Sequence, residues 1–329
     1  MRLPFEEPHD ADSQVSSAVV SIIKDASRVP EEPYVLFNGR CEELLRSLPK
    51  KPLFDLIVTS PPYNIGKPYE QITELEAYRI KQKKIISELT SRLKLNGSIC
   101  WQVGNYVLPT RGNRGGIYPL DFLFHPLFQE QGLVLRNRII WRFGHGLHCK
   151  HRFSGRYEVI LWYTRDNEYY FDLDSVRVAS KYPGKRHYKG PNVGKLSSNP
   201  RGKNPEDVWD VALDEKWDAV WDIPNVKSNH VEKHDHPCQF PVGLVERLVL
   251  ALSPSAGLVF DPFAGVASAG VAAAIHGRKF WGCEIVSEYV EIGAKRVQDA
   301  LDGTAKYRPH NRPIYDHTQS PLSRLPSNQ

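Results

Sequence analysis

The sequence predicts an α/β fold with a mostly parallel sheet. Apolar runs of strand length recur along the 329-residue chain, and segments with helical spacing of apolar side chains separate them. Residues 258–284 read as a strand, a turn of small residues, a helix and a second strand, which is the pattern of a parallel βαβ unit. A further apolar strand, 54–58, runs into the consecutive prolines Pro61 and Pro62.

The elements are expected in the following order. Residues 1–33 are polar and predict a loosely held arm, and residues 304–329 predict a polar, mobile tail. Asn96-Gly97 is expected to end a long helix that precedes a buried strand. Strands are predicted at 34–38, 54–58, 98–103, 133–141, 157–163, 258–261 and 279–284, and helices at 41–48, 74–93, 119–131, 242–252 and 287–301.

Length and composition set the class of protein. A chain of this length allows one large domain with an insertion. The five cysteines are scattered and odd in number, which is typical of a protein from the reducing cytoplasm. No apolar run approaches the length of a membrane span, and the acidic N-terminal residues do not resemble a signal peptide. We therefore expect a cytoplasmic protein with no membrane partner.

The turn Thr59-Ser60-Pro61-Pro62-Tyr63-Asn64 is the first candidate site. The two prolines fix their own φ angles and hold Ser60 and Pro61 out of the helical region, so that their carbonyls become fixed acceptors. The Ser60 hydroxyl and the aromatic face of Tyr63 stand beside them. This set suits a planar ring that bears an amine, although a proline-rich turn that merely closes a strand has the same pattern.

The turn Asp261-Pro262-Phe263-Ala264-Gly265 is the second candidate site. Small residues let a ligand approach the backbone at the N-terminus of a helix. The next strand ends in Glu284, and an acid at that place commonly binds ribose hydroxyls. The dinucleotide motif G-x-G-x-x-G is absent from this unit, so the pattern favours a nucleoside-containing cofactor other than NAD.

Together the two turns resemble motifs of the beta group of amino-methylating DNA methyltransferases. T-S-P-P-Y-N is similar to their catalytic motif, D-P-F-A-G to their cofactor motif, and H-P-C-Q-F-P at 236–241 to the segment that covers the methionine part of the cofactor. The resemblance implies a circularly ordered, Rossmann-like methyltransferase fold with S-adenosylmethionine as cofactor. It also implies catalytic roles for Ser60, Pro61, Pro62 and Tyr63, and cofactor contacts from Phe240, Pro241, Asp261, Phe263, Gly265 and Glu284.

The resemblance further implies how the chain is divided. Residues 34–164 are expected to form the catalytic half, 165–225 an inserted target recognition region, and 226–303 the cofactor half. The expected reaction moves a methyl group to an exocyclic amine of a base in double-stranded DNA, after the base leaves the helix. Serine at the position of Ser60 accompanies cytosine N4 methylation more often in this family, and adenine N6 is the alternative. A cognate restriction endonuclease is a candidate partner, and a monomer or a homodimer is expected.

The charge distribution predicts where DNA binds. Residues 136–203 hold fifteen Lys and Arg against five Asp and Glu, whereas the whole chain carries only +5. Within 175–205 eight basic residues occur without an acid, interleaved with aromatic side chains. Such a block favours a surface that contacts phosphates over an ordinary solvated face. The candidate DNA contacts are Lys181, Lys185, Arg186, Lys189, Arg201 and Lys203.

Several competing interpretations are weighed against these. One alternative is a zinc site formed by His145, His148, Cys149 and His151. No second cysteine pair lies nearby, so no metal is predicted. Phe143, Phe153 and the histidines are expected to line the pocket for the target base. Trp209, Trp217 and Trp221 are expected to pack the recognition region onto the main domain, and base stacking is the alternative.

Three departures from the family pattern leave alternatives open. Pro237-Cys238-Gln239 resembles the nucleophile motif of cytosine C5 methyltransferases, although it precedes the cofactor motif here. Arg40 stands where the family has an acid near the cofactor's adenine, so Glu42 or Glu43 could substitute. Arg40 and Ala267, where glycine is frequent, are also compatible with a non-catalytic DNA-binding relative.

Overall fold

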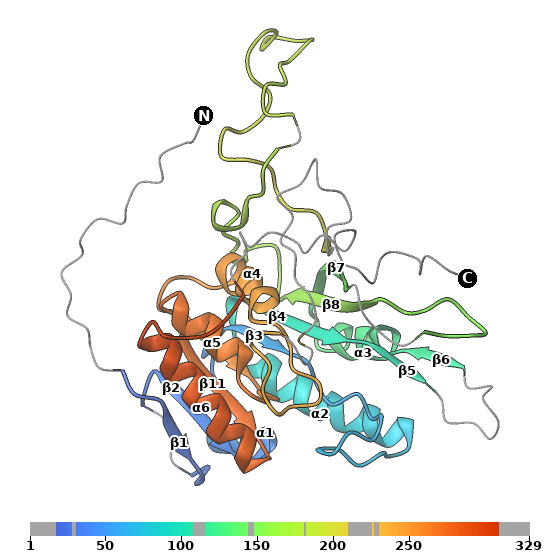
Figure 1. Cartoon of the computed structure of the whole chain (residues 1–329), viewed down its shortest axis with the longest axis vertical. Coiled ribbons are helices and arrows are strands. Elements are labelled where there is room, and N and C mark those ends of the chain that lie inside the picture. The colour runs from blue at the N-terminus through green and yellow to red at the C-terminus, as the bar shows by residue number, and fades with distance from the viewer. Residues whose placement is uncertain are drawn as a thin grey trace, which may run out of the picture.

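The computed structural model describes residues 18–27, 31–107, 116–143, 148–180, 182–209, 226 and 230–308. Within these residues nine strands form one sheet, in the order β1-β2-β11-β10-β3-β4-β8-β7-β9 (Figure 1). The neighbouring strands from β1 to β4 all run parallel, while β8 is antiparallel to both β4 and β7. The prediction of an α/β fold with a mostly parallel sheet is confirmed.

The strands and helices have the following bounds. The strands of the large sheet are β1 (Ser21–Ile23), β2 (Tyr34–Asn38), β3 (Phe54–Thr59), β4 (Leu93–Val103), β7 (Val134–Arg142), β8 (Tyr157–Thr164), β9 (Val208–Trp209), β10 (Leu258–Asp261) and β11 (Lys279–Glu284). A second sheet pairs β5 (Asn105–Val107) with β6 (Ile117–Pro119). The helices are α1 (Cys41–Ser47), α2 (Leu75–Arg92), α3 (Leu120–Gln129), the short 3-10 turn η1 (Asp174–Val176), α4 (Val242–Leu252), α5 (Ser268–Ile275) and α6 (Ser287–Leu301).

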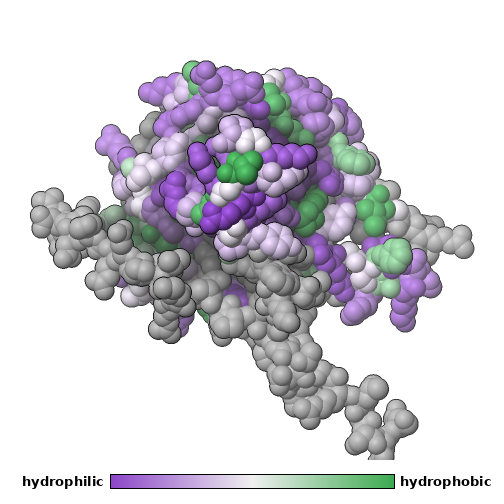
Figure 2. Space-filling view, turned by 90° about the horizontal axis from the view of Figure 1, so that it is seen from above, coloured by the Kyte–Doolittle hydropathy of each residue, from purple (hydrophilic) through white to green (hydrophobic). Residues whose placement is uncertain are grey.

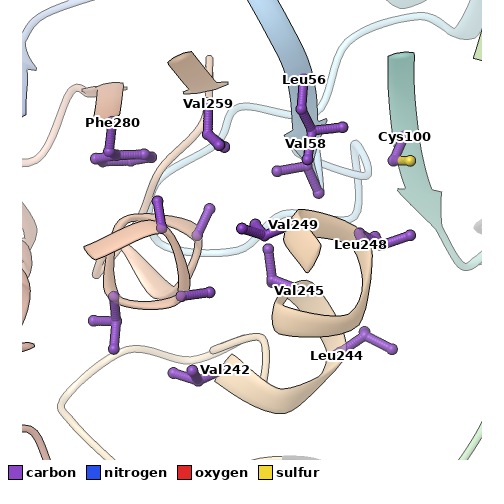
Figure 3. Packing of buried hydrophobic residues seen from close by; sticks show 14 of the residues in the cluster. Leu56, Val58, Cys100, Val242, Leu244, Val245, Leu248, Val249, Val259 and Phe280 are labelled. Carbon is purple, nitrogen blue, oxygen red and sulfur yellow. The ribbon is translucent and has the colours of Figure 1, made fainter. Parts of the chain in front are cut away.

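Two hydrophobic cores hold the helices on the two faces of the sheet. Helices α4, α5 and α6 contribute to the core on one face, and α1, α2 and α3 contribute to the core on the other. Figure 3 shows Val245 and Val249 of α4 lying under Leu56 and Val58 of β3. Each fully buried side chain of this size contributes roughly 1.5–3 kcal/mol to folding. The cores therefore fix the strand ends that carry the site.

The strand β4 starts earlier than the sequence indicates. A helix to residue 93 and a stop at Asn96-Gly97 were expected, but α2 ends at Arg92 and β4 begins at Leu93. Leu93 pairs with Phe54, and the register then shifts before Leu56. A Cβ on Gly97 would lie 2.9 Å from the Asp55 carbonyl oxygen. Gly97 thus allows two strands to approach closely and does not mark the end of a helix.

Part of the predicted N-terminal arm belongs to the sheet. The prediction of a loosely held arm is wrong for Ser21–Ile23, because these residues form strand β1, which pairs in parallel with β2. The Val20 N–H also donates to Gln298 Oε1 of α6 at 3.2 Å. A strand of three residues is too short to show the apolar alternation that would reveal it in the sequence. The start of the predicted tail is likewise held, since Tyr307 packs against the core.

The connection between η1 and β9 leaves the body of the molecule and rises above the sheet (Figure 1). We call residues 177–207 the basic finger. Val178 and Lys203 form an antiparallel bridge at its base, and Arg186 and Leu196 form another farther out. The described residues on the face seen from above are predominantly hydrophilic (Figure 2). No helix among the described residues has the length and apolar character needed to cross a membrane.

Candidate active site

The two predicted turns meet at one place in the sheet. Strand β3 carries the catalytic turn and lies beside β10, which carries the cofactor turn, although about 200 residues separate them in the chain. The connection from β3 through α2 leads to β4 on one side, while the connection from β10 through α5 leads to β11 on the other. Ligands of open α/β sheets bind beyond the carboxyl ends of the strands at such a switch point.

A buried hydrogen bond joins the two turns. Thr59 Oγ1 donates to Asp261 Oδ1 at 2.6 Å, and the Phe263 N–H donates to the same oxygen at 3.0 Å. Burial raises the pKa of Asp261 to about 7, while these two donors act in the opposite direction by stabilising the carboxylate. Sequence reasoning named Asp261 and Phe263 but not Thr59, because a threonine at the end of a strand carries no distinguishing signal.

Glu284 closes the cofactor turn from the neighbouring strand β11. Its carboxylate accepts from the Gly265 N–H at 3.0 Å and from the Val286 N–H at 2.8 Å, one bond to each oxygen. A carboxylate has about four acceptor sites, so Glu284 keeps capacity for the hydroxyls of a ribose. This donor and acceptor set fits the nucleoside part of S-adenosylmethionine. Gly265, at φ 53°, adopts a conformation that favours glycine.

Ala267, at a position where the family frequently has glycine, is accommodated by its surroundings. Ala267 caps α5 with φ 55°, a left-handed conformation that costs an alanine roughly 1–2 kcal/mol. Arg296 of α6 donates to the Val266 carbonyl and to Ser268 Oγ, and so holds the turn on both sides of Ala267. Gly293 faces the alanine, and a Cβ at Gly293 would lie 3.1 Å from that of Ala267. The turn thus retains its shape without glycine at 267.

The segment 232–241 borders the cofactor turn. His236 is buried, and its Nε2 lies 3.1 Å from the position that a Cβ on Gly265 would take. Its ring stacks on Tyr69 and meets Tyr289 edge-on, with centroids 5.7 and 4.6 Å apart. Burial lowers the pKa of His236 to about 4, so the imidazole is neutral near pH 7. Sequence reasoning quoted His236 within its motif without assigning it a contact.

The two residues assigned to cofactor binding in this segment lie at the start of α4. Pro241 is the N-cap of the helix and is buried, while Phe240 is half-buried and packs against the core. Glu232 orders the segment by accepting from the Val242 N–H at 2.9 Å. Direct contacts of Phe240 and Pro241 with the cofactor remain predictions.

The catalytic turn is held by hydroxyl groups. Ser60 Oγ and Tyr63 Oη lie 3.0 Å apart, and Tyr63 Oη lies 3.3 Å from Glu158 Oε2 of β8. Gln102 of β4 donates to the same Glu158 oxygen. The Tyr78 hydroxyl of α2 donates to the Pro62 carbonyl at 2.7 Å. Glu158 and Gln102 were missed by sequence reasoning; the signal available was a polar residue inside each of two apolar strands.

The loop after the catalytic turn is held by hydrogen bonds between its own residues. Asn64 has φ 61° and is buried, and its side chain bonds the Thr73 N–H and carbonyl, each at 2.8 Å. The Glu70 carboxylate accepts from the N–H groups of Asn64, Ile65 and Lys67 at 2.8–3.1 Å. These bonds fix the position of Tyr63 from its C-terminal side.

The aromatic lining of the base pocket stays a prediction, and His145 lies outside the described residues. Phe143 packs on Trp141 with centroids 5.2 Å apart, and Phe153 is 99% exposed. Glu158 borders a separate pocket of about 130 Å³, whose other lining residues are Val103, Gly104, Asn105, Pro119, Asp121, Phe122, Arg138, Tyr157 and Val159. An exposed loop places Phe153 in solvent, which the basic sequence around it could have indicated.

The remaining open interpretations fall partly outside the described residues. No group of three or more potential metal ligands occurs among the described side chains, and His145 lies beyond them.

Trp209 is buried beneath Arg247, with the guanidinium 4.6 Å from the ring centroid, which confirms a packing role for this tryptophan. Trp217 and Trp221 lie outside the described residues. Of the two acids that could substitute at the place of Arg40, Glu43 lies nearer to the preceding residue, Gly39. Its carboxylate oxygen would lie 3.1 Å from a Cβ added to Gly39.

The predicted DNA contacts lie together on the basic finger, except Lys181, which falls outside the described residues. Lys185, Arg186 and Lys189 are exposed, and with Lys203 they line a hollow of about 610 Å³ that also includes Tyr182 and Tyr188. Arg201 pairs with Asp174 at 2.6 Å and Lys203 with Glu206 at 3.1 Å, so acids flanking the block offset two of its charges.

The fold places the two turns side by side beyond the carboxyl ends of β3 and β10, an arrangement typical of enzymes that bind a nucleoside-containing cofactor. The comparisons with known proteins specify this class further. The family model described as N6/N4 DNA methylase matches residues 54–295. The type II methyltransferase M.BglII of Bacillus subtilis is 43% identical over 257 residues, which cover 78% of this chain and 67% of that protein. The DNA adenine methyltransferase YhdJ of Escherichia coli K12 is 30% identical, with 86% and 88% covered.

A solved structure agrees with this assignment. The putative DNA modification methylase TTHA0409 of Thermus thermophilus, complexed with S-adenosyl-L-methionine, aligns with a TM-score of 0.56 and 25% identity over 82% of this chain and 96% of that one. The chain therefore belongs to the N6/N4 DNA methylase family, and it is a DNA methyltransferase that uses S-adenosylmethionine. The C5 interpretation of Cys238 finds no support in this family.

Proposed function

We propose that the chain methylates the N4 amine of cytosine within a specific sequence of double-stranded DNA. The observation that carries this proposal is the hydrogen-bonded pair Ser60 and Tyr63, which stands next to the cofactor turn through the bond between Thr59 and Asp261. Serine at the first position of the motif favours cytosine in this family. Adenine N6 is the second candidate, and the 30% identity to a DNA adenine methyltransferase favours it.

The protein's role in the reaction is to position a poor nucleophile. The lone pair of a base amine is delocalised into the ring. Acceptors at Ser60 and the Pro61 carbonyl would bind the amine hydrogens and draw the nitrogen towards tetrahedral geometry, which frees that lone pair. Tyr63 would cover the ring face. S-adenosylmethionine, when bound, supplies a methyl group on a sulfonium, and positioning for in-line attack then provides most of the acceleration.

The basic finger is proposed to hold the DNA. It carries eight Lys and Arg against two acids, whereas the rest of the chain is close to neutral, and Lys185, Arg186 and Lys189 are exposed on it. The duplex would bind to it through phosphates while the target base is extruded into the site, at a cost of roughly a few kcal/mol. We also propose a cytoplasmic enzyme, monomeric or homodimeric, whose partner in restriction is an endonuclease for the same sequence.

The test is to identify the product. DNA from cells that express the chain is digested to nucleosides for mass spectrometry, and modified positions are mapped at base resolution. N4-methylcytosine at one recurring sequence is the expected result. N6-methyladenine would establish the second candidate, and unmodified DNA from cells that contain folded, S-adenosylmethionine-binding protein would contradict both.

A further inference from the structure

The catalytic turn continues into a chain of hydrogen bonds that ends on a carboxyl group. Ser60 Oγ lies 3.0 Å from Tyr63 Oη, and Tyr63 Oη lies 3.3 Å from Glu158 Oε2. Gln102, which is 4% exposed, donates to that same oxygen from β4. Ser60 and Tyr63 follow the end of β3, Gln102 lies in β4 and Glu158 lies in β8, and these three strands are adjacent in the sheet. Sequence separation hides this arrangement, since Tyr63 and Glu158 are 95 positions apart in the chain.

The carboxylate determines the direction of the whole chain. An ionised Glu158 has no proton to donate, so it accepts from the Tyr63 hydroxyl and from the Gln102 amide. Burial and the charge of Glu158 raise the pKa of Tyr63 well above its ordinary value, so the phenol keeps its proton. With that proton directed at Glu158, Tyr63 can only accept from Ser60. The lone pairs of Ser60 Oγ are then left to accept from an amine.

We propose that Glu158 is the terminal proton acceptor of the methyl transfer, reached from the base amine through the hydroxyls of Ser60 and Tyr63. This inference rests on the proposed function. The amine lone pair forms the new N–C bond, and the electron pair of the broken S–C bond stays on sulfur. The nitrogen then loses one proton to Ser60, Ser60 passes its own to Tyr63, and Tyr63 passes its own to Glu158. Within the protein only Glu158 changes charge, from carboxylate to carboxylic acid, and the loss of the positive charge on the sulfonium balances this change.

The surroundings of Glu158 suit a group that gains and releases a proton. Burial raises its pKa, while the bonds from Gln102 and Tyr63 act against that rise, so the carboxyl binds a proton more readily than an exposed one. The pocket that it borders has a volume of about 130 Å³, which exceeds the roughly 10–15 Å³ that one water needs. The other titratable groups lining it are Tyr157 and the ion pair of Asp121 with Arg138, whose atoms lie 2.7 Å apart. The pocket gives the proton a path to solvent.

The experiment is the pH dependence of a single round of methyl transfer, with cofactor and duplex DNA saturating. The wild-type rate should rise with pH as Glu158 ionises and then level off. Glu158→Gln keeps the shape of the side chain but cannot bind a proton, so its rate should be about 100-fold lower on the plateau and should lack the rising limb. Tyr63→Phe keeps the ring and should show the same loss. Both should bind S-adenosylmethionine and DNA within twofold of wild type.

Gln102→Leu tests whether the rising part of the pH–rate profile, the rising limb, reports the ionisation of Glu158. It removes a donor that stabilises the carboxylate, so the pKa of Glu158 should rise further and the limb should move to higher pH. Glu130→Gln is the matched control, because Glu130 is an exposed carboxylate that pairs with Lys83 on another part of the surface. It should leave the rate and the profile unchanged.

Two results would overturn the proposal. A Glu158→Gln protein with the wild-type rate and limb would show that the carboxyl takes no proton. A slow variant that keeps the wild-type limb would assign Glu158 a purely structural role. If the wild-type product is N6-methyladenine, the cytosine assignment fails, yet the comparison still tests Glu158, since that amine loses a proton too.

Discussion

At the scale of single residues, the catalytic turn depends on Tyr63 more than its motif suggests. Its hydroxyl joins Ser60 to Glu158, and its ring borders Gly104, whose added Cβ would lie 3.1 Å from the ring. The turn therefore holds Tyr63 in place before any base arrives. Such preorganisation reduces the ordering that binding must otherwise impose.

The first prediction concerns the ring itself. Tyr63→Ala removes the stacking surface, and stacking on a base is worth roughly 1–3 kcal/mol. We expect the single-turnover rate to fall more than about 100-fold, because the stacking ring and the hydroxyl that links Ser60 to Glu158 are both lost, while calorimetry finds S-adenosylmethionine binding within twofold of wild type. Methyl transfer close to the wild-type rate would show that Tyr63 does not cover the base.

The second prediction concerns Glu284, which is half-buried at the end of β11. Glu284→Ala removes the proposed acceptor for ribose hydroxyls, and hydrogen bonds to charged groups contribute roughly 1.5–3 kcal/mol. We expect the Kd for S-adenosylmethionine to rise at least tenfold by calorimetry. Glu288→Ala is the control, since Glu288 is exposed in the first turn of α6. Equal affinities for the two variants would remove Glu284 from the cofactor site.

At the scale of elements, the helix α5 begins from a turn with two left-handed residues, Gly265 and Ala267. Two neighbouring elements hold this turn by hydrogen bonds, β11 through Glu284 and α6 through Arg296, and His236 of the segment 232–241 lies beside Gly265. The turn keeps an unusual conformation because its contacts determine it from every side. Its N–H groups consequently point to fixed positions.

The third prediction separates strain from contact in this turn. Gly265→Ala and Gly277→Ala both place alanine at positive φ, 53° and 65°, and each should lower the free energy of unfolding by roughly 1–2 kcal/mol. A Cβ meets His236 only at Gly265, whereas nothing lies within 4 Å of one at Gly277. We therefore expect weaker S-adenosylmethionine binding from Gly265→Ala alone. The two measurements are denaturant unfolding and calorimetry, and equal binding by both variants would refute a role for the His236 contact.

At the scale of the whole molecule, charge is separated from the catalytic body. The basic finger rises from the sheet beyond η1 and carries eight Lys and Arg against two acids, while the rest of the chain is close to neutral (Figure 1). Ion pairs with Asp174 and Glu206 offset Arg201 and Lys203 at its base. The outer basic residues should consequently contribute most to the attraction of phosphates.

The fourth prediction uses the salt dependence of DNA binding. Each phosphate contact adds about −0.9 to the slope of log affinity against log salt. Neutralising Lys185 and Arg186 together should flatten the slope by about one to two units, on cognate and scrambled duplexes alike. The control neutralises Arg46 and Lys279, which are exposed on α1 and at the amino end of β11. An unchanged slope for the Lys185 and Arg186 variant would place both residues outside the interface.

The sequence by itself determined the parallel sheet, the two turns and the basic block, because each depends on local chemistry. Proline restricts its own backbone, small residues permit close approach, and apolar periodicity marks buried strands. The tertiary structure alone decided which distant groups meet. Thr59 bonds Asp261 because β3 lies beside β10, and Glu158 bonds Tyr63 because β8 pairs with β4. The order of strands in the sheet determines these contacts. A single polar residue within an apolar strand does not indicate which distant side chain it will contact.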